Sequence, residues 1–141
     1  MLQRIQTIWL LLAAACGFSM YKLTIFEAQL PNNTYYRLSA TESLFLFAVI
    51  VSAACLSMIA VFLYKNRPLQ RRIAIIGVLL SLLATGLEVW KINAYKSTAT
   101  FVKGTYAWGG LLPILMAVFL ILAARGIRKD EKLVRSLDRL R

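Results

Sequence analysis

The sequence has no histidine, and it has few of the other residues from which metal and catalytic sites are usually built. There are only two cysteines, Cys16 and Cys55, and six acidic residues. A structural zinc site needs about four closely spaced nitrogen or sulfur ligands, so we expect no metal site. Both cysteines lie inside apolar runs, and we predict two small buried residues rather than a disulfide.

Enzymatic chemistry has little support in the residues that remain. General acid–base catalysis would depend on Glu88 or on the loop acids Glu27 and Glu42. The chain carries neither a G-x-S-x-G nucleophile motif nor a phosphate-binding P-loop. We therefore predict that the protein is not an enzyme and that it binds no cofactor.

Charge is also scarce, at 16% of the residues, while apolar residues make up 60%. Average soluble domains have about 25% charged residues, so this balance favours a membrane protein. Four long apolar runs, each apolar on all faces, predict membrane-spanning helices at residues 5–26, 44–64, 73–92 and 106–124. The predicted fold is all-α: an antiparallel four-transmembrane-helix bundle over residues 1–125, followed by an amphipathic cytoplasmic helix over 126–141.

The positive charge predicts which way the bundle faces. Twelve lysines and arginines lie near the two termini and in the polar turn Tyr64–Arg72, and five lie on the opposite side. The positive-inside rule then puts both termini in the cytoplasm. The net charge is +11, and the positive residues gather where they would face an anionic membrane surface. The chain has no nucleic-acid-binding motif, so we expect no nucleic-acid partner.

The C-terminal stretch 126–141 is basic and has an imperfect apolar stripe. Leu133, Val134, Leu137 and Leu140 share one side of a helix. Two interpretations stay open: a helix that lies on the inner leaflet, or a docking helix for a membrane-protein or cytoplasmic partner. The residues predicted to contact lipid or a partner are Arg128, Lys129, Lys132, Arg135, Arg139 and Arg141.

Glu88 is the ionisable residue that lies well inside a predicted span. Gly77, Ser81 and Ala84 fall on the same helix face, so this face should turn toward another helix. Lys22 on the first span lies at comparable depth, and Lys91 is one turn away. Glu88 therefore predicts either a structural ion pair with Lys22 or Lys91, or a proton or cation site.

Small residues also recur at helical spacing in two other predicted spans. Ala13 and Gly17 are four residues apart, and Ala53, Ser57 and Ala60 lie on one face. Such faces allow two helix backbones to approach closely, so we expect helix–helix contacts there.

Both ends of the chain resemble one particular family. The opening Met1–Thr7, M-L-Q-R-I-Q-T, and the closing Asp130–Arg141, D-E-K-L-V-R-S-L-D-R-L-R, are similar to those of uncharacterised four-transmembrane-helix proteins of Bacteroidota, a family known as a domain of unknown function. The resemblance implies a multi-pass protein of a bacterial inner membrane. It implies no activity and no catalytic residue.

Two functions are compatible with these features. The first is a small integral inner-membrane protein with a structural or accessory role, such as a subunit of a larger membrane complex, whose basic tail contacts anionic lipid or a partner. The alternative is a small oligomeric transporter or channel-like protein that uses Glu88 and Lys22.

Overall fold

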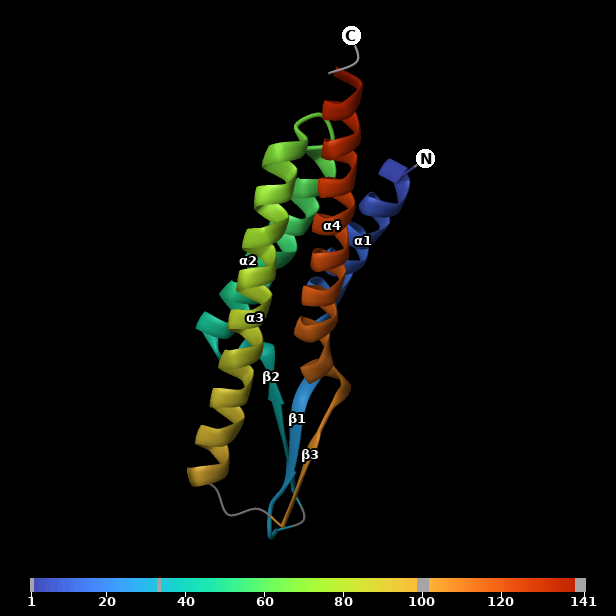
Figure 1. Cartoon of the computed structure of the whole chain (residues 1–141). Helices are drawn as coiled ribbons and strands as arrows, with labels where there is room; N and C mark the ends of the chain where they lie inside the picture. The colour runs from blue at the N-terminus through green and yellow to red at the C-terminus, as the bar shows by residue number, and fades with distance from the viewer. Residues whose placement is uncertain (1, 33, 99–101, 139–141) are drawn as a thin grey trace.

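Four helices run alternately up and down and form an antiparallel bundle (Figure 1). The computed structural model describes the backbone of residues 2–32, 34–98 and 102–138, and the side chains from residue 5 to residue 134 within those ranges. The helices are α1 (Leu2–Ser19), α2 (Leu44–Phe62), α3 (Arg67–Thr98) and α4 (Leu112–Asp138). Each helix packs against two neighbours, in the ring order α1, α2, α3, α4. Both termini and the α2–α3 turn therefore lie at one end of the bundle.

A small antiparallel sheet closes the other end, which corrects the all-α prediction. Its strands are β1 (Thr24–Gln29), β2 (Tyr35–Ser39) and β3 (Lys103–Tyr106), in the order β2–β1–β3. β1 and β2 form a hairpin between α1 and α2, and β3 comes from the α3–α4 connection (Figure 1). The sheet joins these two connections, which lie far apart in the sequence, through backbone hydrogen bonds.

The first apolar run is divided between a helix and a strand, so the predicted span 5–26 is too long. α1 ends at Ser19, and the backbone then turns, with Met20 N–H donating to the Gly17 carbonyl at 3.4 Å. Thr24, Ile25 and Phe26 belong to β1, where β-branched and aromatic residues are favoured. Hydropathy reports only that this stretch is apolar, and it cannot separate a buried strand from the end of a helix.

Of the other three predicted spans, α2 agrees with its prediction to within two residues, and α3 is longer than its prediction at both ends. The fourth prediction is wrong at its start, because Tyr106 belongs to β3 and α4 begins only at Leu112, and α4 then continues well past residue 124. With 32 residues α3 spans about 48 Å, and with 27 residues α4 spans about 40 Å. A hydrocarbon core is about 30 Å thick, so both helices extend beyond that thickness. α3 extends toward the sheet, and α4 extends toward the end that holds the termini.

The stretch 126–141 does not begin a separate helix, because α4 continues without a break to Asp138. Ile127 is fully buried, and a Cβ added to Gly126 would lie 2.8 Å from Cγ of Gln6 on α1. The start of the predicted tail is therefore part of the bundle, held by contact with α1. Residues 139–141 lie outside the described part of the chain.

The polar turn is shorter than the predicted Tyr64–Arg72, because α3 already begins at Arg67. The buried Gln70 side chain donates from Nε2 to the Ala60 carbonyl oxygen at 2.9 Å, which ties the start of α3 to the end of α2. Arg67 donates to the backbone carbonyl of Asp130 at 3.3 Å. The arginines of this stretch thus stand on a helix beside α4.

The short 3-10 helices η1 (Ala40–Glu42) and η2 (Trp108–Leu111) connect the sheet to α2 and α4. η2 lies directly against β1, where Ala107 N–H donates to the Ile25 carbonyl at 2.9 Å. A Cβ added to Gly109 would lie only 2.3 Å from the carbonyl oxygen of Thr24. This close approach of two backbones requires glycine at position 109.

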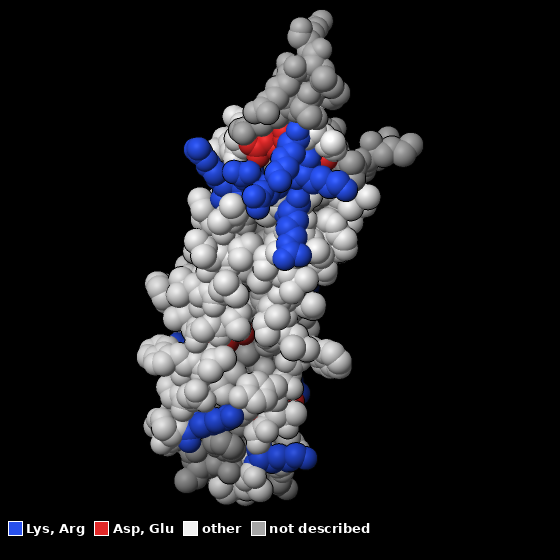
Figure 2. Space-filling model, in the orientation of Figure 1, with Lys and Arg blue, Asp and Glu red and all other residues white. Residues whose placement is uncertain are grey.

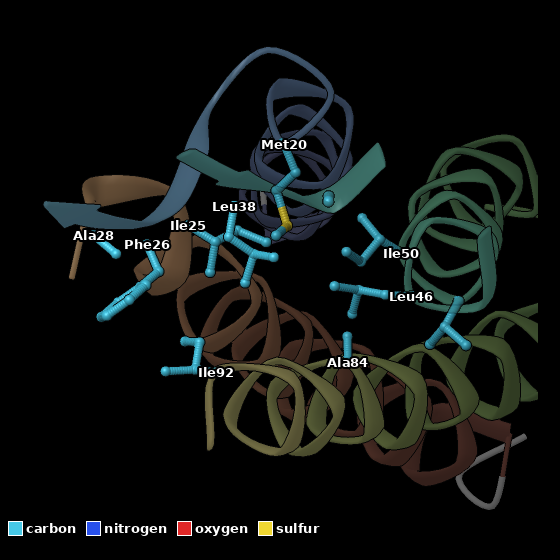
Figure 3. Close-up of a cluster of buried hydrophobic side chains, with 11 residues drawn as sticks. Met20, Ile25, Phe26, Ala28, Leu38, Leu46, Ile50, Ala84 and Ile92 are labelled. Carbon is cyan, nitrogen blue, oxygen red and sulfur yellow. The ribbon is translucent and has the colours of Figure 1, made fainter. Parts of the chain in front are cut away.

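The buried side chains form two clusters along the bundle axis. One joins the sheet to the helices and includes Met20, Phe26, Leu46, Ala84 and Ile92 (Figure 3). The other lies among the helices and includes Leu10, Met116, Leu120 and Ile127. The sheet is therefore packed on the helices through the first cluster.

The small-residue faces are buried at helix contacts, as predicted. Ala13, Ala53 and Ala60 are fully buried, and a Cβ added to Gly17 would lie 2.7 Å from Cβ of Ala54 on α2. The prediction of two buried cysteines is wrong for Cys55, which is exposed on α2, and Cys16 is only half-buried; both are free thiols.

Large apolar side chains cover the outside of the bundle between its two ends. Figure 2 shows a broad surface with few charged side chains between a crowded basic end and a few basic side chains at the sheet end. By length and composition, three helical stretches could cross a membrane: Leu44–Phe62, Arg67–Thr98 and Trp108–Val134. The apolar part of α1 is shorter than these.

Candidate functional site

Glu88 lies on the buried face of α3, as the sequence predicts. Gly77, Ser81 and Ala84 are buried on the same face, and Glu88 itself is only 3% exposed. Its Oε1 atom is fully shielded and has no hydrogen-bond partner. It stands between Ala84 and Ile92, two members of the cluster beneath the sheet. The bundle therefore encloses an acidic group in apolar surroundings.

The predicted ion pair of Glu88 with Lys22 or Lys91 is not formed, since neither amine lies within ion-pair distance of the carboxylate among the described residues. Lys22 is exposed, because α1 ends at Ser19 and leaves Lys22 in the following turn. Lys91 places its Nζ 5.8 Å from the ring centroid of Trp90. The early end of α1 is the reason that the predicted partner lies outside the bundle.

The basic end of the molecule is formed by the start of α3 and the end of α4 (Figure 2). Of the predicted contact residues, Arg128, Lys129 and Lys132 are exposed there. The side chain of Arg135, and Arg139 and Arg141 as a whole, lie outside the described part of the structure. Arg71, which was predicted to lie in a turn, joins this surface from α3 and forms an ion pair with Glu131 at 2.8 Å.

A groove of about 430 Å³ lies between α3 and α4 at this basic end. It is lined by Arg71, Ile75 and Val78 of α3 and by Ile121, Ala124, Arg125 and Arg128 of α4. A smaller hollow of about 190 Å³ shares Arg71 and Arg128 with the groove and adds Glu131 and Lys132. The sequence gives the basic residues, but their alignment with apolar ones depends on how the two helices pair.

A second cleft, of about 410 Å³, lies at the sheet end between β2, the start of α2 and the end of α3. The rings of Tyr36 and Tyr95 stack there with centroids 4.7 Å apart. The Tyr36 hydroxyl donates to Glu42, and this bond, with some burial, raises the pKa of Tyr36 to about 12. This cleft is not predicted from the sequence, because part of its lining comes from α3 beyond the predicted end of that helix at residue 92.

Within the described ranges, no three His, Cys, Asp or Glu side chains gather where they could hold a metal ion. The ion pairs among these residues are Arg37–Glu27, on paired strands of the sheet, and Arg71–Glu131. The candidate sites are therefore the buried carboxyl group, the sheet-end cleft and the basic groove.

These features define a class: a bundle of four helices, three of them long and apolar enough to cross a membrane, with a small sheet at one end. The family follows from the sequence, since the model of the domain of unknown function DUF4293 matches residues 2–140. The chain belongs to that family. No curated protein and no solved structure matches it significantly.

Proposed function

We propose that the protein is an integral protein of a bacterial inner membrane, in Bacteroidota, that serves as an accessory subunit of a larger membrane assembly. The observation that supports this most directly is the arrangement of its surface. Exposed apolar side chains cover the helices between the basic end and the sheet end. In water such a surface would be unfavourable, whereas acyl chains solvate it well.

The proposed orientation has the basic end in the cytoplasm and the sheet outside it, following the positive-inside rule. A reporter that is active only in the periplasm tests this orientation. Fused after Arg141 it is expected to stay silent, and inserted at Asn32 in the β1–β2 turn it is expected to be active. An active fusion after Arg141 would overturn the orientation.

The accessory role is supported by exposed positive side chains at the basic end, which are accessible to a partner. Lys129 and Lys132 project from the end of α4, beyond the apolar part of the bundle. Deleting residues 126–141 would be a poor test, because it would remove the buried Ile127 and disturb the bundle. Reversing exposed charges leaves the core intact.

The test is purification of the tagged full chain in a mild detergent, followed by measurement of the mass of the complex. We expect one complex of fixed composition, which dissociates in the double variant Lys129→Glu/Lys132→Glu. The matched control, Lys22→Glu/Lys103→Glu, reverses two exposed charges at the sheet end and should leave it intact. Recovery of the wild-type chain alone would contradict the accessory role.

The alternative, an oligomeric transporter or channel-like protein, is favoured by one observation, the buried Glu88 with its unpartnered Oε1. In this case Glu88 binds a proton or cation during transport, and several copies together form the path, with Lys22 at its outer end. Purified protein in proteoliposomes should then carry a pH-dependent flux that Glu88→Gln abolishes. A variant that changes only thermal stability would exclude this function.

A further inference from the structure

The groove between α3 and α4 is graded from charged to apolar along the bundle axis. Arg71 and Arg128 stand at the level nearest the basic end, while Val78 and Ile121 lie farthest from it. This follows from helix geometry, because α3 runs away from the basic end while α4 runs toward it. Arg71 and Val78 are seven residues apart, which corresponds to about 10 Å of helical rise.

That length matches the boundary of a membrane leaflet. The headgroup layer is about 6 Å thick on each side, and the acyl chains begin beneath it. With Arg71 and Arg128 at headgroup level, Ile75, Val78 and Ile121 reach the upper acyl region. The groove thus provides cationic groups and apolar surface in the order in which a phospholipid presents its phosphate and its chains.

Of the three arginines that line the groove, only one forms an ion pair with a described residue. Arg71 is fixed by its ion pair with Glu131, whose side chain is only 13% exposed. Arg125 and Arg128 have neither an ion pair nor a hydrogen bond to any described residue. Two guanidinium groups that line the groove therefore have no acidic partner among the described residues. Arginine is well suited to bind phosphate oxygens there.

We propose that this groove binds one anionic glycerophospholipid of the cytoplasmic leaflet. Its phosphate lies among Arg71, Arg125 and Arg128, and one acyl chain runs along Ile75, Val78 and Ile121. The adjoining hollow, lined by Arg71, Arg128, Glu131 and Lys132, holds the uncharged remainder of the headgroup, whose hydroxyls can donate to the Glu131 carboxylate. This inference rests on the proposed membrane location and orientation, and it names a ligand for the basic end.

The experiment uses the full chain, purified in a neutral detergent and stripped of lipid. Phosphatidylglycerol or phosphatidylcholine is then added back, and retained lipid is counted by native mass spectrometry while its dissociation constant is measured. We expect one tightly held phosphatidylglycerol and weak binding of phosphatidylcholine. Inorganic phosphate in a separate arm should neither compete nor raise the melting temperature, because it lacks the acyl chain.

Arg125→Gln/Arg128→Gln should weaken phosphatidylglycerol binding about 30-fold, given the usual contribution of a basic residue near an anionic surface. The matched control is Lys65→Gln/Arg72→Gln, which removes two exposed charges from the same end outside the groove. It should bind nearly as tightly as the wild type.

Equal losses in the two double variants would overturn the proposal, because they would show general attraction to a basic surface. Equal binding of both lipids, or competition by inorganic phosphate, would overturn it as well. The membrane location is tested separately by washing isolated membranes with alkaline carbonate. A chain that stays in the membrane but fails the lipid test refutes the groove alone, and a chain released by the wash refutes the proposed function.

Discussion

Replacing Glu88 by methionine should stabilise the bundle, because the buried carboxyl group has an oxygen without a hydrogen-bond partner. The Glu88 side chain is 3% exposed, and its Oε1 accepts no hydrogen bond. Leaving a buried polar group without a partner costs about 1–3 kcal/mol. Methionine has a similar volume and can fill the same space without a carboxylate. We therefore expect Glu88→Met to raise the free energy of unfolding by about 1–3 kcal/mol.

A second substitution separates the polar contribution from the volume. Glu88→Ala also removes the carboxyl group, but it leaves a cavity between Ala84 and Ile92. Truncation of a buried methionine to alanine costs about 2–5 kcal/mol, so Glu88→Ala should be less stable than Glu88→Met by that amount.

The measurement is reversible unfolding in mixed micelles, with increasing denaturing detergent, followed by tryptophan fluorescence. Trp90 lies two residues from Glu88 and reports on this region. A loss of stability in Glu88→Met would refute the reasoning, because it would mean that the carboxyl group makes a favourable interaction. If Glu88→Met is instead more stable than the wild type, transport measurements on that variant are the next step, since a buried acid that lowers stability is typical of a functional site.

Two further predictions concern the sheet end. Gly109→Ala should destabilise the protein by about 1–3 kcal/mol, because the new Cβ would meet the Thr24 carbonyl oxygen at 2.3 Å. Gly110→Ala is the matched control, since its nearest neighbour would be 3.5 Å away, and thermal melting in detergent compares the two. The second prediction uses the raised pKa of Tyr36, about 12 against an ordinary value of 10.0. The folded state favours the neutral phenol, so this stability is complete below pH 10 and is lost as the pH rises toward 12. In an absorbance titration of tyrosinate, Tyr36→Phe should remove a step near pH 12, and Glu42→Gln should move that step to lower pH. An unchanged titration would contradict the Tyr36–Glu42 bond.

How far the fold could be predicted from the sequence differs among its elements. The predicted second span, 44–64, agrees with α2 because its apolar run is bounded by polar residues at both ends. The predicted first span, 5–26, ends too late, because the apolar residues continue from α1 through the turn into β1. Strand β3 could not be predicted at all from local pattern, since its four residues are exposed and its partner is β1.

The candidate sites differ in the same way. The burial of Glu88 was predictable, because its small neighbours Gly77, Ser81 and Ala84 mark a helix contact. The separation of Glu88 from Lys22 could not be predicted in this way. Their equal depth assumed a first helix that continues past Lys22, whereas α1 ends at Ser19. The basic groove likewise needed the antiparallel alignment of Arg71 with Arg128, which lie on different helices.

The sequence by itself determined the apolar character of the helices and the gathering of basic residues toward the termini and the α2–α3 turn. Both are properties of composition and order, and they need no knowledge of distant contacts. Only the tertiary structure decided that the α1–α2 and α3–α4 connections would pair as a sheet, that α4 would continue through the predicted tail, and that α3 and α4 would form a groove. Each of these depends on hydrogen bonds or side-chain contacts between residues far apart in the chain, and such contacts leave no local pattern.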